Sequence, residues 1–180
     1  MALLNAVIDL SHHNSVTSFQ SAKDSGILGV VHKATEGTGF VDAKYDEHRS
    51  GALAEGLYWG AYHFGISGDV EGQVSHFLDV VHPTATDLLV LDFEPNPREG
   101  TMTLAEAESF VEKIHSRTGR FPGLYAGQAF LQEQLGDRTD TFLKNCFLWR
   151  AWEASHRPQL PVDFKTFCFW QCTDCNTALQ

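Results

Sequence analysis

The chain has 180 residues, of which 43% are hydrophobic and 20% are charged, as in an ordinary folded domain. Its 13 basic and 23 acidic residues give a formal net charge of −10, which argues against nucleic-acid binding because that binding depends on cationic side chains. No apolar stretch approaches the roughly 20 residues of a membrane span, and the basic region of a signal peptide is missing at the start.

Strand-like and helix-like segments alternate through the first two-thirds of the sequence. Apolar, β-rich runs predict strands at 3–9, 28–34, 58–64, 88–94 and 123–126. Helical periodicity predicts helices between them at 16–25, 43–55, 70–81 and 103–118. This alternation is typical of right-handed βαβ units that build a parallel sheet.

Two of the predicted helices have clear boundary signals. The helix at 103–118 begins with the capping-box pair Thr103 and Glu106 and stops at Gly119, whereas the helix at 70–81 ends before Pro83. In the last third, two further strands are predicted at 147–152 and 167–171, with no helical pattern between them. We therefore predict one α/β domain over 1–180.

The predicted architecture is an irregular TIM-like barrel of about five βα units followed by two or three strands that lack helices. Such a barrel is shorter than the roughly 250 residues of a complete one. Parallel α/β folds place their functional sites at the carboxyl ends of the strands. Polar and aromatic side chains follow several predicted strands at that end: Asp9, Lys33, Glu36, Tyr62, Asp92, Glu94, Tyr125 and Gln171.

Asp92 and Glu94 give the most informative pair, because they are two residues apart at the end of an apolar run. A strand places such residues on one face, and two close carboxylates raise each other's proton affinity, which favours one acid and one anion near neutral pH. This pair suits acid-assisted cleavage of a glycosidic or acyl bond. The structural alternatives are a helix cap or an ion pair for Asp92 and Glu94, a turn role for Asp9, and a local ion pair between Lys33 and Glu36.

Metal chemistry is less favoured by the sequence. Cys172 and Cys175 form a lone CxxC motif, and a zinc site needs a second ligand pair at suitable spacing. A metal-dependent hydrolase that uses the histidines is disfavoured because His12 and His13 are adjacent and would point to opposite faces of an extended strand. We expect four histidines to form hydrogen bonds or to pack, namely His12, His13, His32 and His63.

Seven segments, in this order, resemble glycoside hydrolase family 25, the Chalaropsis-type lysozymes (N-acetylmuramidases). The segments are 7–14 (VIDLSHHN), 32–37 (HKATEG), 60–64 (GAYHF), 91–94 (LDFE), 118–125 (TGRFPGLY), 148–152 (LWRAW) and 169–174 (FWQCTD). The resemblance spans nearly the whole chain. It implies an irregular barrel of five βα units closed by three further strands.

The resemblance also implies an activity, namely hydrolysis of the β-1,4 bond between N-acetylmuramic acid and N-acetylglucosamine in bacterial peptidoglycan, without metal or organic cofactor. Glu94 is implied as the general acid and then base. Asp92 would orient the substrate's 2-acetamido group for attack on the anomeric carbon with retention, and Asp9 would stabilise positive charge or assist water. The substrate-binding residues implied are Tyr62, Lys33, Glu36, Tyr125 and Gln171.

The sequence departs from the family pattern at its C-terminal end. Family members usually continue past the segment 169–174 with a Gly-rich loop and a closing strand, and we expect that strand to be missing here. The alternative function is that of a truncated, inactive relative that binds glycan or serves as an interaction module. We expect a monomer that binds neither nucleic acid nor membrane. It would be made in the cytoplasm and would act at the bacterial cell wall after release or non-classical export.

Overall fold

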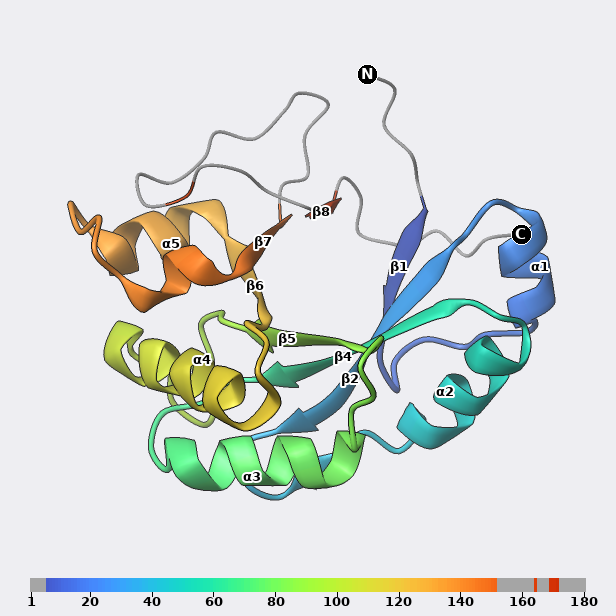
Figure 1. Cartoon of the computed structure of the whole chain (residues 1–180), viewed down its shortest axis with the longest axis horizontal. Coiled ribbons are helices and arrows are strands. Elements are labelled where there is room, and N and C mark those ends of the chain that lie inside the picture. Colours follow the sequence, from blue (N-terminus) through green and yellow to red (C-terminus); the bar gives the residue numbers. More distant parts are fainter. Residues whose placement is uncertain (1–5, 152–163, 165–168, 172–180) are drawn as a thin grey trace. The chain divides into compact units, whose positions relative to one another are not determined.

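A computed structural model describes residues 6–151, 164 and 169–171 of the chain. Two compact units are present, one formed by Met1–Phe64 and Gly72–Val90 and the other by Gly65–Glu71 and Leu91–Gln180. Figure 1 labels most of the helices and strands of both units. No described helix is long and apolar enough to cross a membrane.

The first unit contains three complete parallel strands, a short antiparallel strand and the first residues of β5 (Leu88–Asp92). In chain order its elements are β1 (Val7–Leu10), α1 (Phe19–Asp24), β2 (Gly29–Glu36), β3 (Phe40–Val41), α2 (Tyr45–Ala54), β4 (Tyr58–Phe64) and α3 (Val70–Val81), which begins in the other unit. β2 lies between β1 and β4 and is parallel to both, whereas β3 folds back antiparallel onto the end of β2. The carboxyl ends of β1, β2 and β4 therefore lie along one edge of this part of the sheet.

The core of the first unit lies along β2, which is buried for most of its length, as expected of a parallel strand covered on both faces. Gly60 in β4 allows close packing here, because a Cβ there would lie 3.1 Å from Leu88 Cβ and 3.2 Å from Val31 Cγ2 and those side chains would have to shift. The most deeply buried apolar residues of the unit include Val30, Ala34, Ala52, Ala61, Val74 and Phe77.

The second unit repeats the strand–helix alternation. Its elements are the end of β5 (Leu88–Asp92), α4 (Leu104–Thr118), β6 (Gly123–Gly127), α5 (Gln128–Leu135), the 3-10 helix η1 (Phe142–Asn145), β7 (Phe147–Ala151) and β8 (Phe169–Gln171). β6, β7 and β8 are parallel neighbours in that order. The buried apolar side chains of this unit include Leu91, Met102, Phe110, Val111, Ile114, Leu124, Leu131 and Leu148.

Local signals explain where α4 begins and ends. The Thr103 side chain accepts the Glu106 backbone N–H while the Glu106 carboxylate accepts the Thr103 backbone N–H, so the predicted capping box is confirmed. Gly119 ends the helix in the left-handed conformation with φ 73°, which glycine adopts without a Cβ penalty. The predicted helix at 70–81 and strand at 58–64 coincide with α3 and β4.

The α/β fold with a parallel sheet and helices between the strands is confirmed. Among the described residues five α-helices follow β1, β2, β4, β5 and β6, although the sequence patterns predicted only four of them by position. The first helix is shorter than predicted because Ser18 caps it, its hydroxyl accepting the Ser21 N–H. The expected absence of a closing strand concerns residues 172–180, which lie outside the described part of the chain.

Candidate active site

Three predicted site residues share one face of the first unit. Asp9 in β1 is opposite Val31 of β2, and Lys33, two residues further along β2, is opposite Tyr62 of β4. Because side chains two residues apart lie on the same face of a strand, Asp9, Lys33 and Tyr62 occupy one face at the carboxyl ends of parallel strands. This is the end at which parallel α/β folds place their sites.

Lys33 is held by a carboxylate and two aromatic rings. Its Nζ lies 2.5 Å from Glu36 Oε2, so the ion pair that the sequence offered as the local alternative is present. The same ammonium group lies 5.1 Å from the ring centroids of both Phe40 and Phe64, within the range of cation–π attraction. An irregularity in the β2–β4 pairing between Lys33 and Thr35 brings Glu36 into reach. The Lys33 ammonium is therefore fixed in position.

The opposite face of β2 carries a buried pair of histidines. His32 Nδ1 lies 2.7 Å from the Lys33 carbonyl and must donate to it, so its Nε2 accepts from His48 Nδ1 at 2.9 Å. Burial lowers the pKa of both His32 and His48, which keeps the two rings neutral. These residues are structural, as the sequence predicted for His32.

His63 of β4 plays a similar part against α3. Its Nε2 donates to Gln73 Oε1 at 3.2 Å, so its Nδ1 accepts from the Thr35 hydroxyl at 2.8 Å. Burial lowers the pKa of His63 to about 4. The expectation that His63 forms hydrogen bonds or packs is confirmed, since its ring also lies 5.5 Å from that of Phe77.

The two central carboxylates belong to the second unit, at the end of β5. Asp92 is 6% exposed and its carbonyl accepts the Gly65 N–H at 3.0 Å, whereas Glu94 is partly exposed. Between them Phe93 is fully buried and its ring lies 4.9 Å from that of Phe130 in α5. The Phe93 N–H donates to the Tyr125 carbonyl at 2.9 Å, so pairing with β6 continues beyond the end of β5. In this extended pairing Asp92 and Glu94 lie on the face opposite Phe93.

The neighbouring strands supply aromatic side chains and a glycine to this part of the second unit. Tyr125 of β6 is opposite Trp149 of β7, and their rings meet edge to face at 5.2 Å. Gly127 follows on the same face of β6, and a Cβ placed on it would lie 3.9 Å from Glu94 Oε1. Gln171 of β8 is in register with Ala151, which is in register with Gly127. A side chain at position 127 would therefore touch the Glu94 carboxylate, which the glycine avoids.

Two residues beside the candidate site, Asp42 and Gly127, were not identified from the sequence. Asp42, in the segment after β3, is buried and accepts hydrogen bonds from His12, 30 residues earlier in the chain. No local pattern could have revealed a contact over that separation. A glycine at the end of a predicted strand was visible for Gly127, but its proximity to Glu94 depends on how β5 and β6 are paired.

Metal-binding side chains are not clustered in the described part of the chain, where no group of three or more His, Cys, Asp or Glu residues could hold an ion. Cys146 is a buried free thiol, and burial raises its pKa to about 12, so it is a weak nucleophile and metal ligand. Cys172 and Cys175 lie outside the described residues.

The comparison with known families identifies the chain as a whole. Residues 8–179 match the model of glycosyl hydrolases family 25. This chain belongs to family 25. The resemblance inferred from the sequence motifs is thereby confirmed, and so is the enzyme class, that of a glycoside hydrolase.

Relatives of known activity include bacterial and fungal proteins. Lysozyme M1 of Streptomyces globisporus is 28% identical over 91% of this chain, which spans 60% of that protein's length. The N,O-diacetylmuramidase of Chalaropsis sp. is 26% identical over 92% of this chain and 86% of its own length. The solved muramidase from Acremonium alcalophilum, 29% identical, has a TM-score of 0.85 over 94% of this chain and 87% of its own. This family 25 chain therefore has the fold of a known muramidase.

Proposed function

We propose that this chain is a muramidase that hydrolyses the β-1,4 bond between N-acetylmuramic acid and N-acetylglucosamine in bacterial peptidoglycan. Support comes from family 25 membership over 8–179 and from relatives named as lysozymes and N,O-diacetylmuramidases. The observation that carries the proposal is the arrangement at the end of β5. There Phe93 is buried against Phe130 of α5, and from the alternation of an extended chain we infer that Asp92 and Glu94 share the other face.

In the proposed reaction Glu94 donates its proton to the glycosidic oxygen as the bond from that oxygen to the anomeric carbon breaks. The oxygen of the substrate's 2-acetamido group attacks the anomeric carbon, and the Asp92 carboxylate orients and polarises that group. Water then opens the cyclic intermediate while the Glu94 carboxylate takes its proton. The two displacements restore the original anomeric configuration, so the outcome is retention.

The remaining residues have supporting roles in this proposal. Asp9 stabilises the positive charge of the oxocarbenium-like transition state or assists the attacking water. Substrate contacts are assigned to Tyr62, Lys33, Glu36, Tyr125 and Gln171. Partial burial of Glu94 beside the unsubstituted Gly127 suits a proton donor that must reach a bulky sugar. We further infer an irregular barrel whose last strands lack helices, and a monomer that acts at the bacterial cell wall without metal or cofactor.

Digestion of purified peptidoglycan tests the proposal. The new reducing ends are reduced with borohydride and identified by mass spectrometry, and the expected product is reduced muramic acid rather than reduced glucosamine. Glu94→Gln should lower the rate by about 10² to 10⁴, because it removes the proton donor. Glu99→Gln is the matched control, since Glu99 is exposed and its backbone N–H, rather than its side chain, donates a hydrogen bond to Asn96 Oδ1.

Three outcomes would overturn the assignment. Reducing ends that carry glucosamine would make the chain a different glycosidase. An unchanged digestion rate for Glu94→Gln would show that Glu94 is not the proton donor. Binding to peptidoglycan without any release of fragments would support the glycan-binding module instead. Retention is tested separately by recording the anomeric proton signals of the first product before mutarotation.

A further inference from the structure

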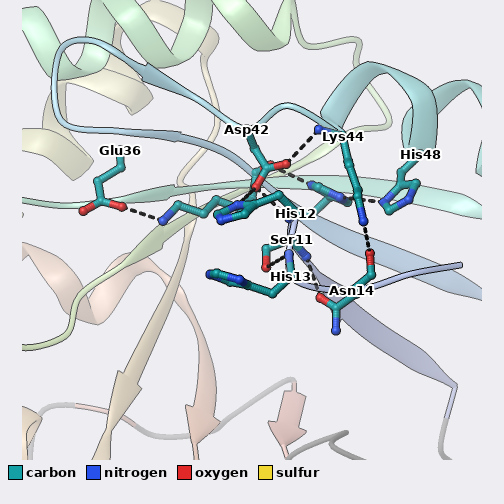
Figure 2. A network of polar contacts seen from close by, with 10 residues as sticks. Ser11, His12, His13, Asn14, Glu36, Asp42, Lys44 and His48 are labelled. Atoms are coloured by element: carbon teal, nitrogen blue, oxygen red, sulfur yellow. Dashed lines mark hydrogen bonds and ion pairs between the residues drawn. The ribbon is translucent and has the colours of Figure 1, made fainter. Parts of the chain in front are cut away.

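A network centred on Asp42 joins the segment after β1 to the segment after β3. The Asp42 carboxylate accepts the backbone N–H of His12 at 2.9 Å, the Nδ1 of the same histidine at 2.8 Å and the Lys44 backbone N–H at 3.0 Å. Lys44 Nζ in turn donates to the Asn14 carbonyl at 2.7 Å. Figure 2 shows the His12 side chain directed at Asp42 within these contacts. The loop after β1 is thus tied at several points to the segment between β3 and α2.

The Asp42 carboxylate fixes the tautomer of His12. Burial raises the pKa of Asp42, but the hydrogen bonds from Lys44 and His12 outweigh burial and hold the pKa below its ordinary value, so the carboxylate is an anion. An anionic carboxylate can only accept, and therefore His12 Nδ1 carries the proton. In the neutral ring Nε2 is then an acceptor. The His12 side chain is 35% exposed, and no described residue bonds to its Nε2.

An exposed aromatic ring lies next to His12. The Phe40 ring centroid is 5.8 Å from that of His12, and Phe40 is 41% exposed. Its backbone is held rigidly, because Phe40 pairs with Glu36 in the β3–β2 ladder and its carbonyl accepts from His76 Nε2 at 2.9 Å. The ring also lies against the Lys33 ammonium. An exposed ring, an oriented imidazole and an ammonium are therefore contiguous and preorganised.

We propose that His12 and Phe40 form a sugar-binding platform that holds one residue of the glycan strand against the first unit. The apolar face of a pyranose would stack on the Phe40 ring, and a ring hydroxyl or acetamide N–H would donate to His12 Nε2. Carbohydrate sites combine aromatic faces with a few fixed polar groups in this way. Asp42 is a positioning residue, since it sets the His12 ring without contacting the sugar. The inference rests on the proposed muramidase function.

Steady-state digestion of soluble, peptide-free glycan strands gives the first test. Phe40→Ala and His12→Ala should each raise KM about tenfold and change kcat less than about twofold, because the platform binds substrate without taking part in bond cleavage. Val41→Ala is the matched control, since Val41 is the next residue of β3, is 46% exposed and projects to the other face. It should leave KM unchanged.

Imidazole NMR gives a second test that does not depend on turnover. In the Glu94→Gln protein, the His12 Nε2 resonance should move on titration with the same glycan strands, while that of the exposed His82 should not. Asp42→Asn should alter the tautomer pattern of His12 even without glycan. An unchanged tautomer pattern would show that Asp42 does not position the His12 ring.

The two proposals fail in different ways. If the wild-type chain releases muramic acid ends but Phe40→Ala and His12→Ala keep the wild-type KM, or if His12 Nε2 stays unmoved while glycan binds, the platform is wrong and the muramidase stands. If the wild-type chain releases no such ends, the muramidase proposal fails first. Because Phe40 is exposed, its alanine variant should fold normally, and thermal melting verifies this.

Discussion

Acid should destabilise this chain through His63, and the size of the effect follows from its environment. In the unfolded chain the pKa of a histidine is near 6.5, whereas burial lowers that of His63 to about 4 in the folded state. The folded state therefore resists protonation. The contribution of the neutral His63 ring to the free energy of unfolding is complete above about pH 6.5, declines as the pH falls and is lost below about pH 4. At 1.36 kcal/mol per pH unit, the free energy of unfolding changes by about 3 kcal/mol over this range.

Urea unfolding at several values between about pH 7 and about pH 4 measures this effect as the change in the free energy of unfolding. His63→Gln removes the titrating ring, so it should be less stable than the wild type at neutral pH but should lose about 3 kcal/mol less on acidification. Contributions from His32, His48 and the carboxylates are present in both proteins and cancel in the comparison.

The control removes an imidazole from the surface. His82 is exposed with φ 42°, a backbone conformation that asparagine tolerates, so His82→Asn should fold and keep the wild-type pH dependence. If His63→Gln and the wild type lose stability in parallel between about pH 7 and about pH 4, the buried, neutral state assigned to His63 is incorrect.

Three further results are expected. Thr103→Ala should lower the free energy of unfolding by about 1 kcal/mol in urea titrations, because it removes the N-terminal cap of α4. Gly127→Ala should unfold as the wild type does, since φ −67° and ψ 144° suit any residue, yet digest peptidoglycan about tenfold more slowly because its methyl group lies beside Glu94. Strong chelators should leave the digestion rate unchanged, and a loss restored by added metal would contradict the carboxylate mechanism.

The sequence predicted the elements whose signals are local. The 70–81 helix has a clear apolar stripe and ends before a proline, and the helix at 104–118 has a capping box at one end and a glycine at the other. Helix α5 was missed because Gly127, which precedes it, provides no side-chain cap and its first turn contains no acidic residue. Strand β3 was missed because two residues are too short to show an alternating pattern.

The candidate site divides in the same way. The positions of Asp9, Lys33, Tyr62, Asp92 and Glu94 at the carboxyl ends of strands could be predicted because each strand was visible as an apolar run, and their roles stay predictions. The partners that fix the site residues could not be predicted, because they come from elements distant in sequence. Asp42 reaches back to His12, and the space beside Glu94 depends on a glycine in β6.

The buried histidines also separate two causes of lost activity in acid. His48 Nδ1 donates a hydrogen bond to His32 Nε2 on the face of β2 opposite the Lys33 side chain. Protonation of His32 Nε2 would therefore bring two N–H donors together. Acid that charges these rings therefore disrupts the layer behind β2 and lowers stability and activity together. Protonation of the Glu94 carboxylate after glycosyl transfer would instead lower activity in a chain that remains folded. Activity and unfolding measured on the same samples across the acid range therefore distinguish structural titration from catalytic titration.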